Sequence, residues 1–425
     1  MNKRHTMPLA AVAVLSLVVS GCASDDSGGG SADGGCTAES LEGSAFVPRV
    51  DDAAQVGIAG SAPVQLLAQE GGTVKVGWFG DLTGATSSFT VGSKQGAELA
   101  IEEANEEGNL NVTIRFVARD NKDASTDTAP AIEQSFIQDN QVVGVIGGAF
   151  SGETLAVGEL FSDAGLTHIS PSATNPDITK NGWPFFRLLS TDQVQAEKTA
   201  ELIDSLGCER VMVVNDRSDY GQGLADLVAS TLGDKVVKTE GVEPTQDYSA
   251  LVSSIQAANP DLVYYGGYGP QASLIIRQMR EAGIEATFMS GDGTKEQSFV
   301  DDAGSDNAEG TILTCPCSDP NAASDEASQT FVSAYRERWG EAPSIYAAEG
   351  YDAGKLMVAA IDASDDDGEV TREEIHEFFD TTTGFQGLTK TYSWDDTGEI
   401  EGGVIIAYVV RDGQIVQLGS IDDLA

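Results

Sequence analysis

Short apolar segments alternate with segments of helical periodicity along most of the chain, and this alternation limits what it can fold into. The segments 74–82 (VKVGWFGDL), 112–120 (VTIRFVARD) and 142–148 (VVGVIGG) have the length and composition of buried strands. Segments 91–107 and 129–139, which lie between them, have helical periodicity. Strands that alternate with helices in this way predict a parallel sheet with helices on both faces. The chain is therefore predicted to be an α/β protein.

The alternation is interrupted once and then starts again, which predicts a second α/β unit. Segment 181–193 (NGWPFFRLLSTDQ) breaks the pattern, and Thr191 suits the N-cap of a new helix. A chain of 425 residues is long enough for two such cores. After Cys317 the pattern is helical, with helices expected at 326–339, 345–363 and 372–381. The chain ends with two strands that are joined by a turn at Asp412-Gly413.

The first 21 residues have the composition of an export signal. Two basic residues precede an apolar run at 9–19 that is too short to span a bilayer. The following residues, 19–22 (VSGC), match a bacterial lipobox, so Cys22 is predicted to become the first residue and to carry lipid. An ordinary cleaved signal peptide is the alternative. We expect an extracytoplasmic protein that is lipid-anchored to the cell membrane, with residues 22–71 as tether and N-terminal extension.

The chain is strongly acidic, with 24 Lys and Arg against 67 Asp and Glu and a formal net charge of −43. Such a charge excludes nucleic acid as a partner, because phosphate groups would be repelled. The acidic residues are spread over the whole sequence, which is typical of a solvated acidic surface. A saline habitat is one hypothesis for this composition, since salt screens the self-repulsion.

Four cysteines remain once Cys22 is assigned to lipid. They are Cys36, Cys208, Cys315 and Cys317. Disulfides are compatible with an exported protein, and four cysteines allow three pairings, which the sequence leaves open. No histidine lies near the CPC segment, so structural pairing or burial is favoured there over a redox or metal site.

Neither catalysis nor a cofactor has support in the sequence. There is no nucleophile elbow, no P-loop and no GxGxxG motif. Segment 365–374 resembles part of an EF-hand calcium loop, but Ala363 stands at the first ligand position. A helix cap by Thr371, with Glu374 completing a capping box, is the favoured interpretation. We expect no enzyme activity, no cofactor and no metal.

Two sets of polar residues follow predicted strands, where ligands bind in open α/β sheets. In the first unit, Ser151 is expected to cap a helix that ends at Gly165, and Thr174 lies in the loop after the next strand. Each alone could be a mere cap or turn former. Together they suit an anion near a helix N-terminus. In the second unit, tyrosines and one carboxylate follow strands, at Tyr220, Tyr268 and Asp292. Hydroxyls facing a carboxylate would complement an amino-acid zwitterion.

These segments resemble the substrate-binding lipoproteins of branched-chain amino-acid ABC transporters, of the Leu/Ile/Val-binding type. The resemblance covers residues 72–417, and its motifs include VIGGAFSGET, HISPSATNPDIT, VNDRSDYGQGLA, FMSGDG and YAAEGYDA. It implies a type I periplasmic-binding-protein fold, in which two doubly wound parallel-sheet lobes are joined by a hinge of three crossings. We assign residues 72–190 and 317–394 to the first lobe, and 191–316 and 395–425 to the second.

The resemblance also implies a role for each site residue. The ligand carboxylate would be held by Ser151, Ala173 and Thr174, and its amino group by Asp292 and the carbonyl of Ser172. The pocket walls would be Tyr220, Tyr268 and Phe89. Two departures from the family concern ligand preference. Asp292 stands where relatives usually carry Glu. The cysteine pair found near the first loop in enterobacterial relatives is absent, and Phe150 stands in its place.

The expected function is therefore capture of an amino acid, branched-chain or otherwise apolar, between two closing lobes, and its delivery to ABC permease subunits in the membrane. The protein is expected to act as a monomer. The alternatives are the same fold binding amides, urea or aromatic carboxylates, and a ligand-sensing receptor domain. An enzyme is the least favoured class.

Overall fold

The structure is a computed structural model that describes residues 36–41, 72–122, 126–364 and 369–424. The predicted export signal and lipobox lie outside these residues. Within them, none of the helices combines the length and the apolar character that a membrane crossing requires.

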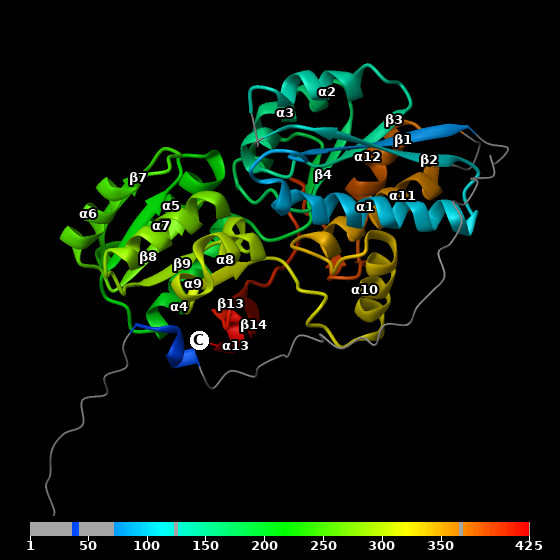
Figure 1. Ribbon diagram of the computed structural model, residues 1–425. Helices are drawn as coiled ribbons and strands as arrows, with labels where there is room; N and C mark the ends of the chain where they lie inside the picture. The colour runs from blue at the N-terminus through cyan, green and yellow to red at the C-terminus, as the bar shows by residue number, and fades with distance from the viewer. Residues whose placement is uncertain (1–35, 42–71, 123–125, 365–368, 425) are drawn as a thin grey trace, which may run out of the picture. The chain divides into compact units, whose positions relative to one another are not determined.

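The first sheet contains five parallel strands in the order β2-β1-β3-β4-β5. They are β1 (Thr73–Gly80), β2 (Thr113–Asp120), β3 (Val142–Ile146), β4 (Thr167–Ser170) and β5 (Phe185–Arg187). On one face, α2 (Ala129–Ile137) and α3 (Ser151–Asp163) cover a core that includes Phe79 and Val145 (Figure 1). The opposite face, with Val76 and Trp78, is covered by α1 (Ser87–Glu107) and by later helices. Helices on both faces of the parallel sheet confirm the predicted class.

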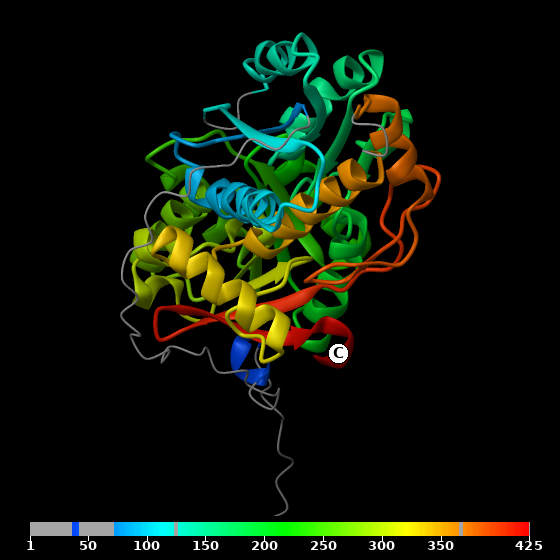
Figure 2. The same ribbon diagram turned by 90° about the vertical axis from the view of Figure 1, so that its right-hand side faces the viewer.

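Helices from the last quarter of the chain complete this first unit. They are α10 (Glu326–Trp339), α11 (Ala347–Ser364) and α12 (Arg372–Thr381), followed by the short strands β11 (Phe385–Gln386) and β12 (Thr391–Tyr392). Figures 1 and 2 show α11 lying along α1. The two helices touch through their backbones, because a Cβ at Gly96 would lie 2.0 Å from the Ala347 carbonyl oxygen and one at Gly350 2.2 Å from that of Ser93. Glycine is required at both positions by this close approach.

The second sheet contains seven strands in the order β14-β13-β10-β9-β8-β6-β7. They are β6 (Val211–Asn215), β7 (Val236–Gly241), β8 (Leu262–Gly266), β9 (Thr287–Ser290), β10 (Ile312–Cys315), β13 (Ile406–Arg411) and β14 (Gln414–Ser420). The first five are parallel, and the last two form an antiparallel hairpin at the edge. Asp412 and Gly413 both have positive φ, at 50° and 73°, as expected for a two-residue hairpin turn.

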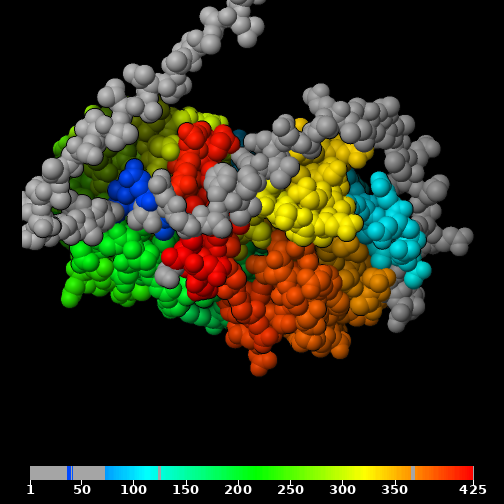
Figure 3. Space-filling model, turned by 90° about the horizontal axis from the view of Figure 1, so that it is seen from below, coloured from blue at the N-terminus to red at the C-terminus, as the bar shows by residue number. Residues whose placement is uncertain are grey.

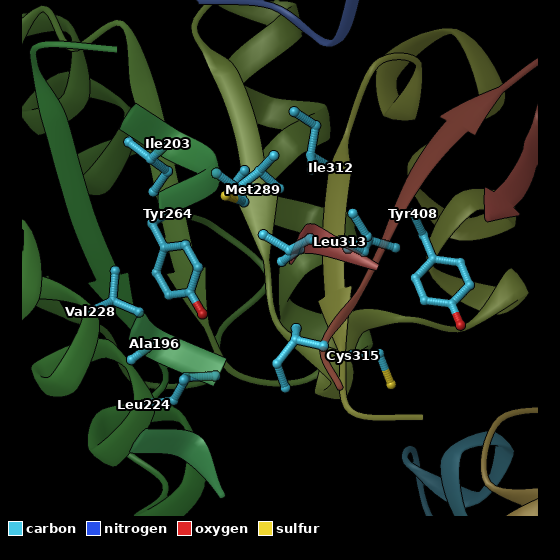
Figure 4. Packing of buried hydrophobic residues seen from close by; sticks show 14 of the residues in the cluster. Ala196, Ile203, Leu224, Val228, Tyr264, Met289, Ile312, Leu313, Cys315 and Tyr408 are labelled. Atoms are coloured by element: carbon cyan, nitrogen blue, oxygen red, sulfur yellow. The ribbon is translucent and has the colours of Figure 1, made fainter. Parts of the chain in front are cut away.

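Six helices and short turns surround the second sheet. They are α4 (Asp192–Ser205), α5 (Asp219–Leu232), α6 (Ser249–Ala258), α7 (Gly269–Glu281), α8 (Gln297–Ala303) and α9 (Ser305–Ala308), with the 3₁₀ turns η3 (Gly233–Lys235) and η4 (Asp292–Thr294) and the final turn α13 (Ile421–Leu424). Figure 4 shows how Ile203 of α4 and Val228 of α5 approach Tyr264 and Met289 of the strands, and all four are buried. This apolar burial is the main stabilising contribution to the second unit.

The chain passes between the two units three times, after β5, after β10 and between β12 and β13. The first crossing contains Thr191, whose hydroxyl accepts from the Val194 amide and caps α4 as predicted. Residues 395–401 were predicted to belong with the second unit, but they contact the first. Glu399 forms an ion pair with Arg187 at 2.9 Å, and Ile400 forms a β-bridge with Trp394.

Two disulfides pair the four cysteines, Cys36 with Cys208 and Cys315 with Cys317. The first bond closes a sequence separation of 172 residues and joins the N-terminal turn η1 (Ala38–Leu41) to the second unit. Ala38 and Leu41 are buried in the same core cluster as Cys208. Figure 3 shows this turn, in blue, between the green α4–α5 region and the red C-terminal strands. This part of the N-terminal extension is thus an integral part of the fold.

Candidate functional site

The loop after β3 is positioned by residues of the neighbouring strand β4. The Gly148 amide donates to His168 Nε2 at 3.0 Å, and Ser170 Oγ donates to the Gly148 carbonyl at 2.9 Å. Burial lowers the pKa of His168 to about 3, so the imidazole is neutral. His168 has a structural role, because the hydrogen bonds of its ring are with the loop backbone.

Ser151 is the first residue of α3, and not its N-cap as predicted. Phe150 has the extended backbone of the cap position, with φ −115° and ψ 146°, and the Glu153 carboxylate accepts from its amide at 3.0 Å. Ser151 is therefore one residue inside the helix, where its side chain reaches the next loop. Its Oγ accepts from the amides of Thr174 and Asn175, at 3.3 and 3.2 Å. A hydroxyl that accepts from two amides keeps its own hydrogen for another acceptor.

The loop after β4 brings Ser172, Ala173 and Thr174 beside Ser151, as the sequence predicted. Ser170 Oγ accepts from the Ala173 amide at 3.0 Å, and Ser172 Oγ donates to the Ala149 carbonyl at 2.9 Å. Thr174 is buried, and its Oγ1 has no hydrogen-bond partner in the described part of the chain. The two loops are thus joined by hydrogen bonds between hydroxyl side chains and backbone groups.

Arg187, which the sequence analysis did not select, holds this second loop in place. Its side chain is fully buried, and its guanidinium donates to the carbonyl oxygens of Ala173 and of Asn175, the latter at 3.0 Å. Glu399 balances the charge, with a contact of 2.9 Å to Nη2. The signal in the sequence was an arginine inside the apolar strand FFRLL, a position that requires an acidic partner.

On the second unit, Asp292 accepts hydrogen bonds from two tyrosines. Tyr220 donates to Oδ1 at 2.9 Å, and Tyr346 donates to Oδ2 at 2.6 Å. Burial raises the pKa of Asp292, and the two tyrosine hydroxyls offset part of that rise. Tyr346 was not predicted, although it lies in the YAAEGYDA motif. Its φ of +60° is rare for a residue with a side chain and indicates a constrained position.

Five aromatic side chains meet beside Asp292, and we call them the aromatic cluster. They are Phe89, Phe150, Tyr220, Tyr268 and Tyr346, all of them buried. Tyr268 is central, with ring centroids 5.7 Å from Phe89, 5.1 Å from Phe150 and 5.1 Å from Tyr220. The three predicted walls are thus in contact, and Phe150 and Tyr346 extend them. Such a cluster offers an apolar lining with hydroxyl tips.

Direct contacts join the two units around this site. Asn175 Nδ2 donates to the Asp219 carbonyl at 2.9 Å, and Ser88 Oγ donates to the Glu296 carboxylate. Burial raises the pKa of Glu296 to about 7. A cavity of about 260 Å³ lies next to the site and is lined by residues that include Ser88, Glu296 and Ile345. The cavity borders the aromatic cluster through Ile345, the neighbour of Tyr346.

Among the described residues, no group of three or more His, Cys, Asp or Glu side chains could hold a metal ion. Thr371 and Glu374 form the predicted capping box of α12, in which the Thr371 amide donates to Glu374 Oε2 at 2.9 Å. Residues 365–368 of the calcium-like segment lie outside the described part of the chain.

Comparison with known proteins identifies the family. A family model for periplasmic binding proteins matches residues 73–414. The chain belongs to this family. A Leu/Ile/Val-binding protein homolog 1 of Brucella abortus is 31% identical over 329 residues, which cover 75% of this chain and 85% of the relative. A leucine-, isoleucine-, valine-, threonine- and alanine-binding protein of Pseudomonas aeruginosa is 28% identical over 355 residues, which cover 82% of this chain and 92% of the relative.

Solved structures agree with this assignment. The Streptococcus pneumoniae protein LivJ, a branched-chain amino acid transporter substrate-binding protein in complex with isoleucine, superposes with a TM-score of 0.74 at 27% identity, over 81% of this chain and 97% of the other. The leucine-binding protein LivK of Thermotoga maritima superposes with a TM-score of 0.75 at 27% identity, over 82% of this chain and 99% of the other. The resemblance to branched-chain amino-acid binding proteins and the fold class inferred from the sequence are therefore confirmed, whereas the lipid anchor stays a prediction.

Proposed function

We propose that the protein is the solute-binding component of an ABC importer and that it binds a branched-chain or other apolar amino acid. The observation that carries the proposal is the pairing of two chemically opposite halves in one buried site. Free hydroxyl hydrogens and a helix N-terminus lie on the first unit, while the Asp292 carboxylate lies on the second and accepts from Tyr220 of its own unit and Tyr346 of the first. A zwitterion with an apolar side chain complements both halves.

Each end of the ligand has its own residues in this proposal. Ser151 and Thr174 donate to the α-carboxylate, since Ser151 Oγ already accepts two amides and Thr174 Oγ1 is unpartnered. Ala173 contributes through its backbone, and the Ser172 carbonyl and Asp292 accept from the α-ammonium group. Charge-assisted bonds of this kind contribute about 1.5–3 kcal/mol each.

The aromatic cluster is proposed to hold the ligand side chain. Phe89, Phe150 and Tyr268 contribute apolar ring surface, whose burial against a leucine or isoleucine side chain is worth about 25 cal/mol per Å². Solutes without such a side chain gain less. This lining favours apolar amino acids over small amides and urea.

Closure between two lobes is the proposed mechanism of capture. We assign residues 72–190 and 317–401 to the first lobe and 191–316 and 402–425 to the second, with the three crossings as the hinge. A ligand that bridges the lobes stabilises the closed form by its differential contacts. The Ser88–Glu296 and Asn175–Asp219 contacts would form on closure.

The partners and location follow from the same role. The family works outside the cytoplasm as a transport component, and we propose that the closed form delivers its ligand to ABC permease subunits. Cys22 would carry the lipid that anchors a monomer to the membrane. No catalytic step and no cofactor are part of this mechanism.

Thermal unfolding of the mature protein tests the proposal. Leucine, isoleucine and valine at 100 times their dissociation constants should each stabilise by about 2.7 kcal/mol, whereas acetamide, urea and benzoate should not. The double variant Ser151→Ala/Thr174→Ala should weaken leucine binding at least 100-fold by calorimetry. Stabilisation by urea or benzoate alone, or unchanged affinity in the double variant, would contradict the proposal.

A further inference from the structure

The second crossing between the two units is bound to both of them through a single peptide group. The carbonyl of Cys317 accepts from the Tyr408 hydroxyl at 2.9 Å, and Tyr408 lies on β13 of the second unit. The following amide, that of Ser318, donates to Glu349 Oε1 at 2.8 Å, and Glu349 lies on α11 of the first unit. The Ser318 hydroxyl donates to the same oxygen at 3.2 Å. Both units therefore hold the one peptide that joins Cys317 to Ser318.

The geometry of this peptide suits it to be a centre of rotation. A planar trans peptide presents its C=O and its N–H in opposite directions. The bonds from Tyr408 and Glu349 therefore reach it from opposite sides. A rotation of one unit about the line through these bonds leaves both intact, whereas a rotation about a distant axis would break one of them. Tyr408 and Glu349 are both fully buried, which strengthens the two bonds.

The Cys315–Cys317 disulfide restricts the residues that lead into this peptide. It closes a sequence separation of 2 around Pro316, whose ring fixes φ. The Cys317 amide donates to Cys315 Sγ at 3.3 Å, and both cysteines are buried. A loop this short restricts the unfolded chain far less than the Cys36–Cys208 bond, which has a separation of 172. We therefore expect the short bond to limit motion in the folded protein more than it adds to stability.

The third crossing has the opposite character. It contains Gly402 and Gly403, which are both exposed, and Gly402 has a φ of 76°. A Cβ at Gly403 would lie 1.9 Å from Ser190 Oγ, so this crossing runs against the first one. Glycine accepts changes in φ and ψ at low cost, which is what a hinge segment requires. The third crossing can thus bend while the second stays fixed.

We propose that the peptide group between Cys317 and Ser318 is the pivot of lobe closure and that the disulfide before it keeps it rigid. This inference rests on the proposed capture of a ligand by closing lobes, and it adds the point about which they turn. The hydrogen bonds from Tyr408 and Glu349 persist in the open and closed forms, and the glycines of the third crossing absorb the change in backbone angles. A rigid pivot leaves the open protein fewer conformations, so less conformational freedom is lost when a ligand closes the lobes.

Amide hydrogen exchange of Ser318, measured by NMR on the mature protein labelled in its serine nitrogens, tests the pivot directly. Because the bond to Glu349 persists, the Ser318 amide should be protected equally without ligand and with saturating leucine. Exchange more than tenfold faster in the ligand-free protein would show that the bond breaks when the lobes open, and this would overturn the proposal.

The variant Cys315→Ser/Cys317→Ser tests the disulfide. It frees the backbone angles of about one residue, so leucine binding measured by calorimetry should weaken by about tenfold. Exchange of the Ser318 amide in the ligand-free protein should become faster, while the urea midpoint should stay close to that of the wild type. The comparison variant Cys36→Ser/Cys208→Ser should show the reverse, with a lower midpoint and unchanged leucine affinity. Wild-type affinity and exchange in the first variant would overturn the role of the short bond.

The variant Tyr408→Phe removes the bond from the second unit and keeps the ring. It should speed exchange of the Ser318 amide and weaken leucine binding. Tyr335→Phe is the matched control, because Tyr335 is also fully buried and donates to Gln95, but both of these residues lie in the first unit. The control should leave exchange and affinity unchanged. Equal effects of the two variants would overturn the proposal, whereas absence of leucine binding by the wild type would instead refute the proposed function.

Discussion

Replacement of Arg187 by methionine tests how the ligand loop is supported. Arg187 is fully buried, and Glu399, at 2.9 Å, has 21% of its side chain exposed. Removal of one partner from a buried ion pair lowers the free energy of unfolding by about 3–5 kcal/mol. Water has partial access to Glu399, so we expect a loss at the lower end of this range. The Ala173 and Asn175 carbonyls each lose a donor, at about 1 kcal/mol apiece. We expect Arg187→Met to lower the free energy of unfolding by about 4–5 kcal/mol.

Urea denaturation of the mature protein measures this loss. With a slope of about 3 kcal/mol/M, the midpoint should fall by roughly 1.5 M. Arg338→Met is the matched control, because Arg338 pairs with Glu102 at 2.7 Å on the surface, with 43% and 36% of the side chains exposed. Such a pair contributes about 0–1 kcal/mol. Leucine affinity should also fall in Arg187→Met and not in the control. If both variants lost less than about 1 kcal/mol, Arg187 would not support the loop.

Two further predictions concern disulfide linkage and pH. The variant Cys36→Ser/Cys208→Ser opens a 172-residue loop and should lose up to about 5 kcal/mol in urea denaturation, whereas an unchanged midpoint would show that the bond contributes nothing to stability. Burial raises the pKa of Glu153 and Glu296 to about 7 each, so the folded protein binds more protons than the unfolded chain between about pH 4 and 7. Stability of the ligand-free protein should therefore decrease as pH rises through that window, with a smaller decrease in Glu296→Gln; a thermal midpoint that rises with pH would contradict this assignment.

The fold could be predicted because its signals are local. Strand and helix periodicity determined the class, and the helices at 326–339 and 372–381 have the predicted bounds because both begin at side-chain caps. Asp325 accepts from the Ser328 amide, and Thr371 from the Glu374 amide. The start of α3 was wrong by one residue because Phe150 gives no cap signal, the capping group being Glu153, three residues later.

The site was predicted in part for the same reason. The carboxyl ends of neighbouring parallel strands meet at one edge of a sheet, so the proximity of Ser151 and Thr174 follows from sequence order. Tyr346 was missed because its hydrogen bond to Asp292 depends on how a segment late in the sequence approaches η4 in space. The disulfide pairing was left open because sequence spacing does not report which cysteines meet in space.

The Cys36–Cys208 bond also determines where a mechanical load enters the protein. A pull on the chain ahead of Cys36 reaches the second unit through a covalent bond, whereas the buried side chains of Ala38 and Leu41 alone would hold a four-residue turn by apolar contact. If Cys22 is the membrane anchor, the second unit is the tethered one. On closure of the proposed lobes, the first unit, with Ser151 and Thr174, would then move toward Asp292 of the tethered unit.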